Sequence, residues 1–357
     1  MSVRHLGPNW YASVMGTAII ANAGATLPVH VPGLRTACTV VWALSGLMLL
    51  ALLSARAVHW VRHRDQAKAH LDDPAVAPFY GCLSMALLAV GAGTMLVGQD
   101  WIGLRAAIAV DAVLFTAGTL VGLVAAVAIP YLMVVKHEVK PGDASPVWLL
   151  PVVAPMVSAA VGPLLVPHLP AGQWQQTMVL ACVAMFGLSL MATLVMLPLI
   201  FARLVTGPAL PLPLTPTLFL VLGPLGQSTT AANKFADVAP TAIQAPYAQS
   251  FTAFAVLYGV PVMGFALMWL ALAGAMVRRA RKNGMGFAMT WWAFTFPVGT
   301  CVTGAEGLAA HTGLVAFKWL AVALFVFLVG AWAVAGVQTL RGLVSGRLLA
   351  APAPAPR

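Results

Sequence analysis

Charged residues are scarce in this sequence: only 8% of its 357 residues are Asp, Glu, Lys or Arg, whereas 61% are hydrophobic. Soluble domains carry roughly 25% charged residues, so this composition excludes an ordinary soluble protein. Apolar runs long enough to cross a hydrocarbon core of about 30 Å recur from end to end, and no polar stretch is long enough to form a separate soluble domain. The sequence therefore predicts an all-α integral membrane protein.

Acidic residues are especially rare inside these apolar runs. Of the nine Asp and Glu residues, only Asp111 falls well inside a run, while Asp100, Asp237 and Glu306 fall at or beyond the ends of runs. Carriers that couple cations to protons normally need intramembrane carboxylates, so that class is disfavoured. For Asp111 we expect a structural role, either an ion pair with Arg105 or a contact between helices.

Motifs for metal binding, disulfide formation and catalysis are also missing. The four cysteines stand alone, without CxxC or His/Cys spacing, and the sequence has no ATP-binding loop. The densest polar cluster, His59 to Asp65, is typical of a charged loop. We therefore expect no cofactor, no metal and no enzymatic activity. The cysteines are Cys38, Cys82, Cys182 and Cys301.

Ten apolar spans can be placed along the chain. An even number puts both termini on one side of the membrane, and the spans form a single polytopic membrane domain over residues 1–348. The Ala/Pro-rich tail, residues 349–357, has nothing to pack and is expected to be disordered. The spans cover about residues 9–28, 34–58, 78–97, 104–134, 147–166, 174–202, 214–232, 248–276, 286–304 and 313–340.

The formal net charge of +10 is explained by where the basic residues lie. Only Arg35, Arg105, Lys234 and Lys318, of 19 Lys and Arg residues, fall on the side opposite the termini. By the positive-inside rule both termini are cytoplasmic, in the inner (cell) membrane of a bacterial-type cell. The basic excess thus indicates topology and contact with anionic lipid headgroups, and it gives no reason to expect nucleic acid binding.

Two residues near the external ends of the spans have simple interpretations. Lys318 is expected to extend its charged group to the membrane interface. His311 could sense pH at the external mouth, although a lone histidine in a loop is usually only solvated.

Glycine and proline are concentrated in the odd-numbered spans. Kinked helices with small residues can approach one another closely and line a cavity, while long apolar helices face lipid. The pattern favours five helical hairpins with odd helices inside and even helices outside. Alternatively, Gly and Pro are simply common in transmembrane helices. The odd-span breakers include Gly16, Gly24, Gly91, Gly93, Pro151, Pro155, Gly162, Pro163, Pro216, Gly223, Pro224, Gly226, Pro297, Gly299 and Gly304.

The ninth span carries the most unusual stretch, Trp291 to Thr300. Pro297 removes a backbone donor inside the span and predicts a kinked helix with Phe294 or Phe296 near the bend. The hypothesis is that other helices surround this bend and enclose a pathway plugged by one aromatic ring. The alternative is a phenylalanine that packs between helices or faces lipid.

Hydroxyl and amide groups are the polar side chains that remain inside the spans. With broken helices that direct N–H groups and positive dipole ends inward, such a lining suits an anion. Each residue alone could equally hydrogen-bond between packed helices. The candidates are Asn9, Thr17, Asn22, Thr94, Ser158, Gln227, Ser228, Thr229, Thr295, Thr300 and Thr303.

Three stretches together carry a family resemblance: Gly7-Pro8-Asn9-Trp10-Tyr11 continuing to Thr17, Gly223-Pro224-Leu225-Gly226-Gln227-Ser228, and Trp291 to Pro297. The sequence resembles the tellurite-resistance/dicarboxylate transporter family, which includes TehA proteins, plant slow anion channels, and yeast malate and sulfite transporters. The resemblance covers essentially the whole chain.

The resemblance implies ten transmembrane helices in five hairpins, arranged with pseudo-fivefold symmetry around a central pore, and a homotrimer. It also implies a phenylalanine in the ninth span that occludes the pore, for which Phe296 is the first choice and Phe294 the second. Gly223, Pro224, Gly226 and Pro297 join Gln227 and Ser228 among the pore-lining candidates. The run Gly223 to Gln227 is more similar to the malate and sulfite branch, which favours a carrier.

The resulting hypothesis is transport of small anions, either C4-dicarboxylates such as malate or sulfite-, tellurite- or chloride-like anions. A membrane sensor or structural component without transport is the alternative. Flux in vesicles would separate these classes, and dependence on a proton gradient would separate a carrier from a channel.

Overall fold

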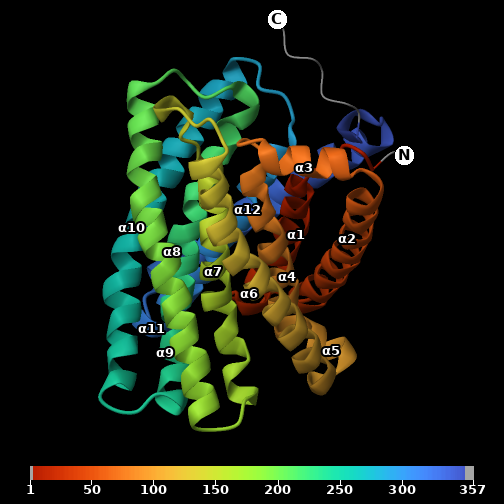
Figure 1. Cartoon of the computed structure of the whole chain (residues 1–357). Helices are drawn as coiled ribbons and strands as arrows, with labels where there is room; N and C mark the ends of the chain where they lie inside the picture. Colours follow the sequence, from red (N-terminus) through yellow and green to blue (C-terminus); the bar gives the residue numbers. More distant parts are fainter. Residues whose placement is uncertain (1–2, 350–357) are drawn as a thin grey trace, which may run out of the picture.

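The computed structural model describes residues 3–349, and in that range it consists of helices with no strand (Figure 1). Seven stretches are long and apolar enough to cross a membrane. They are Leu34–Arg62 (α2), Ala77–Ile102 (containing α4, Gly81–Gly93, and α5, Gln99–Ile102), Leu104–Val135 (α6), Pro146–Leu164 (containing α7, Leu149–Val161), Gln173–Thr206 (α8), Tyr247–Lys282 (α10) and Val315–Val344 (α12).

Three further helices complete the bundle: α1 (Tyr11–Thr26), α9 (Leu222–Ala242) and α11 (Phe296–Thr312). Each follows a 3-10 helix, over Pro8–Trp10, Leu212–Val221 and Met289–Phe294 respectively. With 16 and 17 residues, α1 and α11 are shorter than the other spans, and α9 carries Lys234 and Asp237. The sequence predicts ten membrane spans, whereas the length and composition of the observed helices identify seven candidate spans in the described part of the chain.

Burial divides the helices into an inner and an outer set. In their most apolar windows, α2, α6 and α10 are 22% buried, whereas Ala77–Ile102 is 89% and Pro146–Leu164 is 83% buried. α1 buries every residue from Tyr11 to Gly24, and most of α9 and α11 is buried too. The inner set is therefore α1, α4, α7, α9 and α11, as the positions of Gly and Pro predict.

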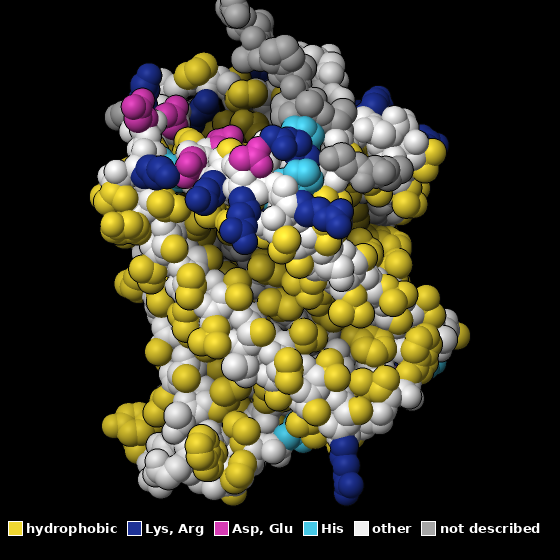
Figure 2. Space-filling model, turned by 45° about the vertical axis from the view of Figure 1, so that its right-hand side comes forward, with side chains coloured by type: hydrophobic (Ala, Val, Ile, Leu, Met, Phe, Trp, Pro, Cys, Tyr) yellow, Lys and Arg dark blue, Asp and Glu magenta, His cyan; other side chains and the backbone are white. Residues whose placement is uncertain are grey.

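The surface has the belt expected of a membrane protein. Figure 2 shows hydrophobic side chains over the middle of the molecule and charged side chains gathered at the end that carries the short helix α3 (Arg64–Asp72). The chain begins at this end (Figure 1), and we call the opposite end the distal end. The 3-10 helix Arg347–Leu349 closes the described part of the chain, so residues 350–357 of the predicted tail lie outside it.

The cluster His59 to Asp65 lies at the terminal end and holds the N-terminal segment. Nδ1 of His59 is 2.9 Å from the Val3 carbonyl oxygen, and its ring stacks on that of His70 at 5.4 Å between centroids. Burial lowers the pKa of His70 to about 4, with a further contribution from the nearby Arg56 guanidinium. These contacts give the cluster a structural role.

Asp111 is buried in α6, and its expected ion pair with Arg105 is not formed. Asp111 is 1% exposed and faces Gly91 of α4, while Arg105 is exposed. The second expectation for this residue, a position between helices, agrees with the structure.

The prediction of a kinked helix in the ninth span is wrong in its local geometry. The chain forms a 3-10 helix over Met289–Phe294, leaves helical geometry at Thr295 (φ −99°, ψ −84°) and begins α11 at Phe296. Pro297 therefore occupies the first turn of a new helix. Proline is favoured there because its missing N–H would have no intrahelical acceptor.

Glycine allows α9 and α11 to approach each other closely. A Cβ atom at Gly226 would lie 2.5 Å from the backbone nitrogen of Cys301 and 2.6 Å from the carbonyl carbon of Thr300. Backbone atoms cannot move away as a flexible side chain can, so only glycine fits without separating the two helices. Small residues at such crossings are typical of membrane helix packing.

We predict that Gly226→Ala lowers the stability of the protein in detergent by about 1–3 kcal/mol, because overpacking forces backbone shifts. The matched control is Gly274→Ala on α10, where a Cβ would meet no atom of the described residues within 4 Å. Thermal unfolding followed by tryptophan fluorescence measures both variants. Equal melting temperatures for Gly226→Ala and the parent would contradict this description of the α9–α11 contact.

Candidate functional site

A cavity of about 170 Å³ lies among the distal halves of the five inner helices. We call it the vestibule, and its polar lining consists of Asn22 and Thr26 of α1, Gln227, Thr230, Asn233, Lys234 and Asp237 of α9, and Thr303 and Glu306 of α11. α4 contributes Ala92, the π-helical turn after it contributes Leu96, and α7 and the turn that follows contribute Ala160, Val161 and Leu164. All five inner elements thus meet at this cavity.

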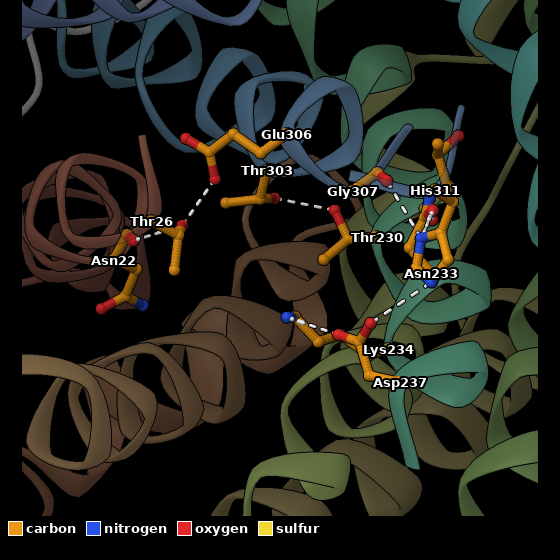
Figure 3. Close-up of polar contacts among 11 residues, drawn as sticks. Asn22, Thr26, Thr230, Asn233, Lys234, Asp237, Thr303, Glu306, Gly307 and His311 are labelled. Atoms are coloured by element: carbon orange, nitrogen blue, oxygen red, sulfur yellow. Dashed lines mark hydrogen bonds and ion pairs between the residues drawn. The ribbon is translucent and has the colours of Figure 1, made fainter. Parts of the chain in front are cut away.

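Hydrogen bonds join α9 to α11 along one wall of the vestibule (Figure 3). The hydroxyl oxygens of Thr230 and Thr303 are 2.7 Å apart, and Thr230 Oγ1 also lies 3.2 Å from the Thr300 carbonyl oxygen. These contacts lie one turn beyond the close approach at Gly226. The two helices are therefore held in register from that crossing to the cavity.

A charged cluster stands at the mouth of the vestibule. Lys234 Nζ is 2.9 Å from Asp237 Oδ2, and the two side chains are 34% and 43% exposed. His311 Nε2 lies 3.3 Å from the other oxygen of Asp237, while its Nδ1 is 2.8 Å from Asn233 Oδ1. The Asn233 amide nitrogen donates to the Thr229 carbonyl, so Oδ1 is an acceptor and His311 Nδ1 carries a hydrogen.

His311 therefore differs from the lone, solvated loop residue that the sequence predicts. It belongs to the last turn of α11, and its side chain is only 15% exposed. The predicted span ends at residue 304, whereas α11 continues to Thr312. The extra turns carry both His311 and Glu306 alongside α9.

The position of Glu306 also differs from the prediction. It was expected at or beyond a helix end, but it is only 8% exposed and lines the vestibule. Its Oε2 atom is 2.5 Å from the hydroxyl oxygen of Thr26 on α1 (Figure 3). The signal in the sequence is spacing, because Glu306 follows Thr303 by three residues and so shares its helix face.

On the terminal side of the vestibule the inner helices close around apolar side chains. A void of about 10 Å³ there is lined by Met15 of α1, Met85 of α4, Leu149, Leu150 and Val153 of α7, Leu220, Gly223 of α9, and Phe296 and Pro297 of α11. We call this ring the apolar seal. Gly223 and Gln227 are one turn apart on α9, so the seal follows directly on the vestibule.

The two candidate phenylalanines face different surroundings. Phe296 is 2% exposed and lines the void within the apolar seal. Phe294 packs edge-on against Phe219, with ring centroids 4.8 Å apart, and against Trp291 at 5.8 Å. Phe219 in turn stacks on Phe327 of the outer helix α12. Phe294 is thus part of an aromatic contact toward the periphery, and Phe296 belongs to the central ring.

The other predicted residues separate into two groups. Asn22, Gln227 and Thr303 line the vestibule, and Gly223 and Pro297 line the void. Thr17 accepts a hydrogen bond from the Trp332 indole at 3.1 Å, so it faces α12. The remaining candidates lie in neither lining, and several of them make contacts between helices: Asn9, Thr94, Ser158, Pro224, Gly226, Ser228, Thr229, Thr295 and Thr300.

An all-helical bundle with a membrane belt, a charged vestibule at one end and an apolar seal beyond it is the architecture of a membrane transport protein. Residues 5–340 match the voltage-dependent anion channel family, SLAC1, and the chain belongs to that family. This confirms the family resemblance found in the sequence. The members of this family are channels and transporters, not enzymes.

Curated relatives agree with this assignment over nearly their full lengths. An uncharacterised transporter of Methanocaldococcus jannaschii is 25% identical over 350 residues, which cover 97% of this chain and 96% of the relative. A second one from the same organism is 24% identical, with 97% of each chain covered. A sulfite efflux pump, SSU1, of Arthroderma otae is 26% identical over 342 residues, covering 93% of this chain and 89% of the pump.

Proposed function

We propose that this protein moves small anions across the membrane through a central pathway that runs from the vestibule through the apolar seal and is closed by Phe296. The observation that carries the proposal is that the same five inner helices line both the vestibule and the void beside Phe296. A pathway bounded by all five is shielded from lipid on every side, as polar passage through a bilayer requires.

The proposed architecture has ten spans in five hairpins: α1 with α2, α4 with α6, α7 with α8, α9 with α10, and α11 with α12. The first member of each hairpin is inner and the second outer, which supports a pseudo-fivefold arrangement. Further elements of the proposal are a homotrimer, cytoplasmic termini and a bacterial-type inner membrane. The gathering of charge at the terminal end supports this orientation (Figure 2).

Two features of the pathway reduce its repulsion of anions. Lys234 places a cation at the vestibule, where it offsets the charge of Asp237. α11 begins at Phe296, so the positive end of its dipole is directed at the apolar seal. Neither feature binds an anion so tightly that it could not leave, which suits passage better than storage.

The substrate class is supported by the relatives and by a local motif. A sulfite efflux pump matches most of this chain, and the run Gly223 to Gln227 is similar to the malate and sulfite branch. We therefore propose sulfite-like oxyanions or C4-dicarboxylates such as malate as substrates. Tellurite- or chloride-like anions belong to the same test panel.

We predict that Phe296→Ala raises anion flux in proteoliposomes roughly tenfold or more, because it removes an apolar plug that keeps ions and water out of the seal. The matched control is Phe294→Ala, which removes the same side chain volume outside the central ring and should stay within about twofold of the parent. Sulfite, malate, nitrate and chloride are compared with and without a pH gradient.

Equal flux in Phe296→Ala and the parent would remove Phe296 as the gate. Absence of flux with every anion in both proteins would contradict anion transport itself and would favour a sensor or structural component.

We predict that Lys234→Gln lowers anion flux by about fivefold at low ionic strength, because the vestibule then loses its cation and keeps the charge of Asp237. Added salt should narrow this difference by screening. Lys318→Gln, in the first turn of α12 and outside the vestibule, is the control. If both variants lower flux equally, Lys234 has no special role at the mouth.

A further inference from the structure

The hydroxyl group of Thr26 has two close partners and only one hydrogen to donate. Its Oγ1 atom lies 3.2 Å from the Asn22 carbonyl oxygen and 2.5 Å from Glu306 Oε2 (Figure 3). A backbone carbonyl can only accept a hydrogen bond, and an ionised carboxylate can only accept as well. Both contacts are satisfied at once if Glu306 carries a proton and donates it to Thr26, while Thr26 donates to Asn22.

The second carboxyl oxygen of Glu306 gives independent support for a protonated side chain. Oε1 is buried and has no hydrogen-bond partner among the residues that the structure describes, and the residue as a whole is 8% exposed. An ionised carboxylate with one buried, unpartnered oxygen loses hydration without compensation. The same oxygen in a neutral carboxyl group is a weaker acceptor, so its burial costs much less. Both observations favour the protonated acid.

We infer that Glu306 is a proton-holding residue of the vestibule and that anions enter only while its carboxyl group is protonated. This inference rests on the proposed function, since it concerns the entry of the same anions. The role is separate from that of the apolar seal, because Glu306 lines the vestibule and not the void.

Charge balance explains why the proton would matter. Lys234 and Asp237 form an ion pair and cancel each other. With Glu306 protonated the vestibule is close to neutral, whereas an ionised Glu306 adds an uncompensated negative charge that repels an anion. His311 Nε2 faces Asp237 at 3.3 Å from the side of α11.

The groups that can influence Glu306 come from several helices. Lys234 is the cation that lines the same cavity, and among the described residues the other carboxylate of its lining is Asp237. Titratable and charged side chains on the surrounding elements include Lys234 and Asp237 on α9, His311 on α11, Arg35 and Cys38 on α2, Tyr258 on α10 and Lys318 on α12.

The test uses nitrate, which does not titrate in the working range, so that any pH dependence belongs to the protein. Nitrate flux is measured in proteoliposomes with equal pH on both sides, from about pH 6 to about pH 9. The parent should lose flux by about fivefold or more as the pH rises, because one buried charge appears in the vestibule.

Glu306→Gln is the informative variant. Its amide can donate to Thr26 and keeps the neutral state at every pH, so its flux should stay nearly constant across the range. Asp111→Asn is the matched control, since it neutralises a buried carboxylate on α6 outside the vestibule and should retain the pH dependence of the parent.

A second measurement does not depend on transport. The purified parent should show the infrared C=O band of a protonated carboxyl group at neutral pH. The band should be weaker in Glu306→Gln, whereas Asp111→Asn should keep the part of the band that comes from Glu306. If Glu306→Gln removes no such band, or if its nitrate flux follows pH as the parent does, the inference is overturned while anion transport stands. If the band is found but neither the parent nor the variants conduct any anion, the proposed function fails, and with it the inference that anions enter only while Glu306 is protonated.

Discussion

The close contact between α9 and α11 is the constraint on which the site depends. Gly226 permits backbone contact with Thr300 and Cys301, and the hydroxyl pair of Thr230 and Thr303 continues the contact toward the distal end. Because the two helices are locked in this register, Gln227 and Lys234 face the vestibule together with Glu306. The same register sets the first residue of α11, Phe296, opposite Gly223 in the apolar seal. Separation of these helices would disturb both sites at once.

Hydropathy and the positions of glycine and proline were enough to predict an all-helical membrane protein and its inner and outer helices. Those properties depend on composition averaged over many residues, which local detail does not alter. The break at Thr295 could not be read in this way, because Pro297 is equally compatible with a kink and with the first turn of a new helix. Glu306 and His311 were misplaced for a related reason: the apolar run stops before α11 does.

Single polar residues were the least predictable part of the site. Thr17 and Asn22 lie on the same inner helix, but Thr17 bonds the Trp332 indole whereas Asn22 lines the vestibule. Only the packing of neighbouring helices decides which face of a fully buried helix meets a cavity, and α1 has no amphipathic pattern because nearly all its surroundings are protein. The two phenylalanines were likewise separated only by the aromatic contacts that hold Phe294 toward α12.

The central claim is that the Phe296 ring closes a continuous path beyond the vestibule. The most direct measurement is the reaction of Leu220→Cys, whose side chain borders the same void, with a membrane-impermeant thiol reagent added from the vestibule side. The native cysteines of the described residues are all buried. With Phe296 present the new thiol should be protected, and in the Phe296→Ala background it should react rapidly. Rapid reaction with Phe296 in place, or protection in both backgrounds, would contradict a pathway closed by this ring.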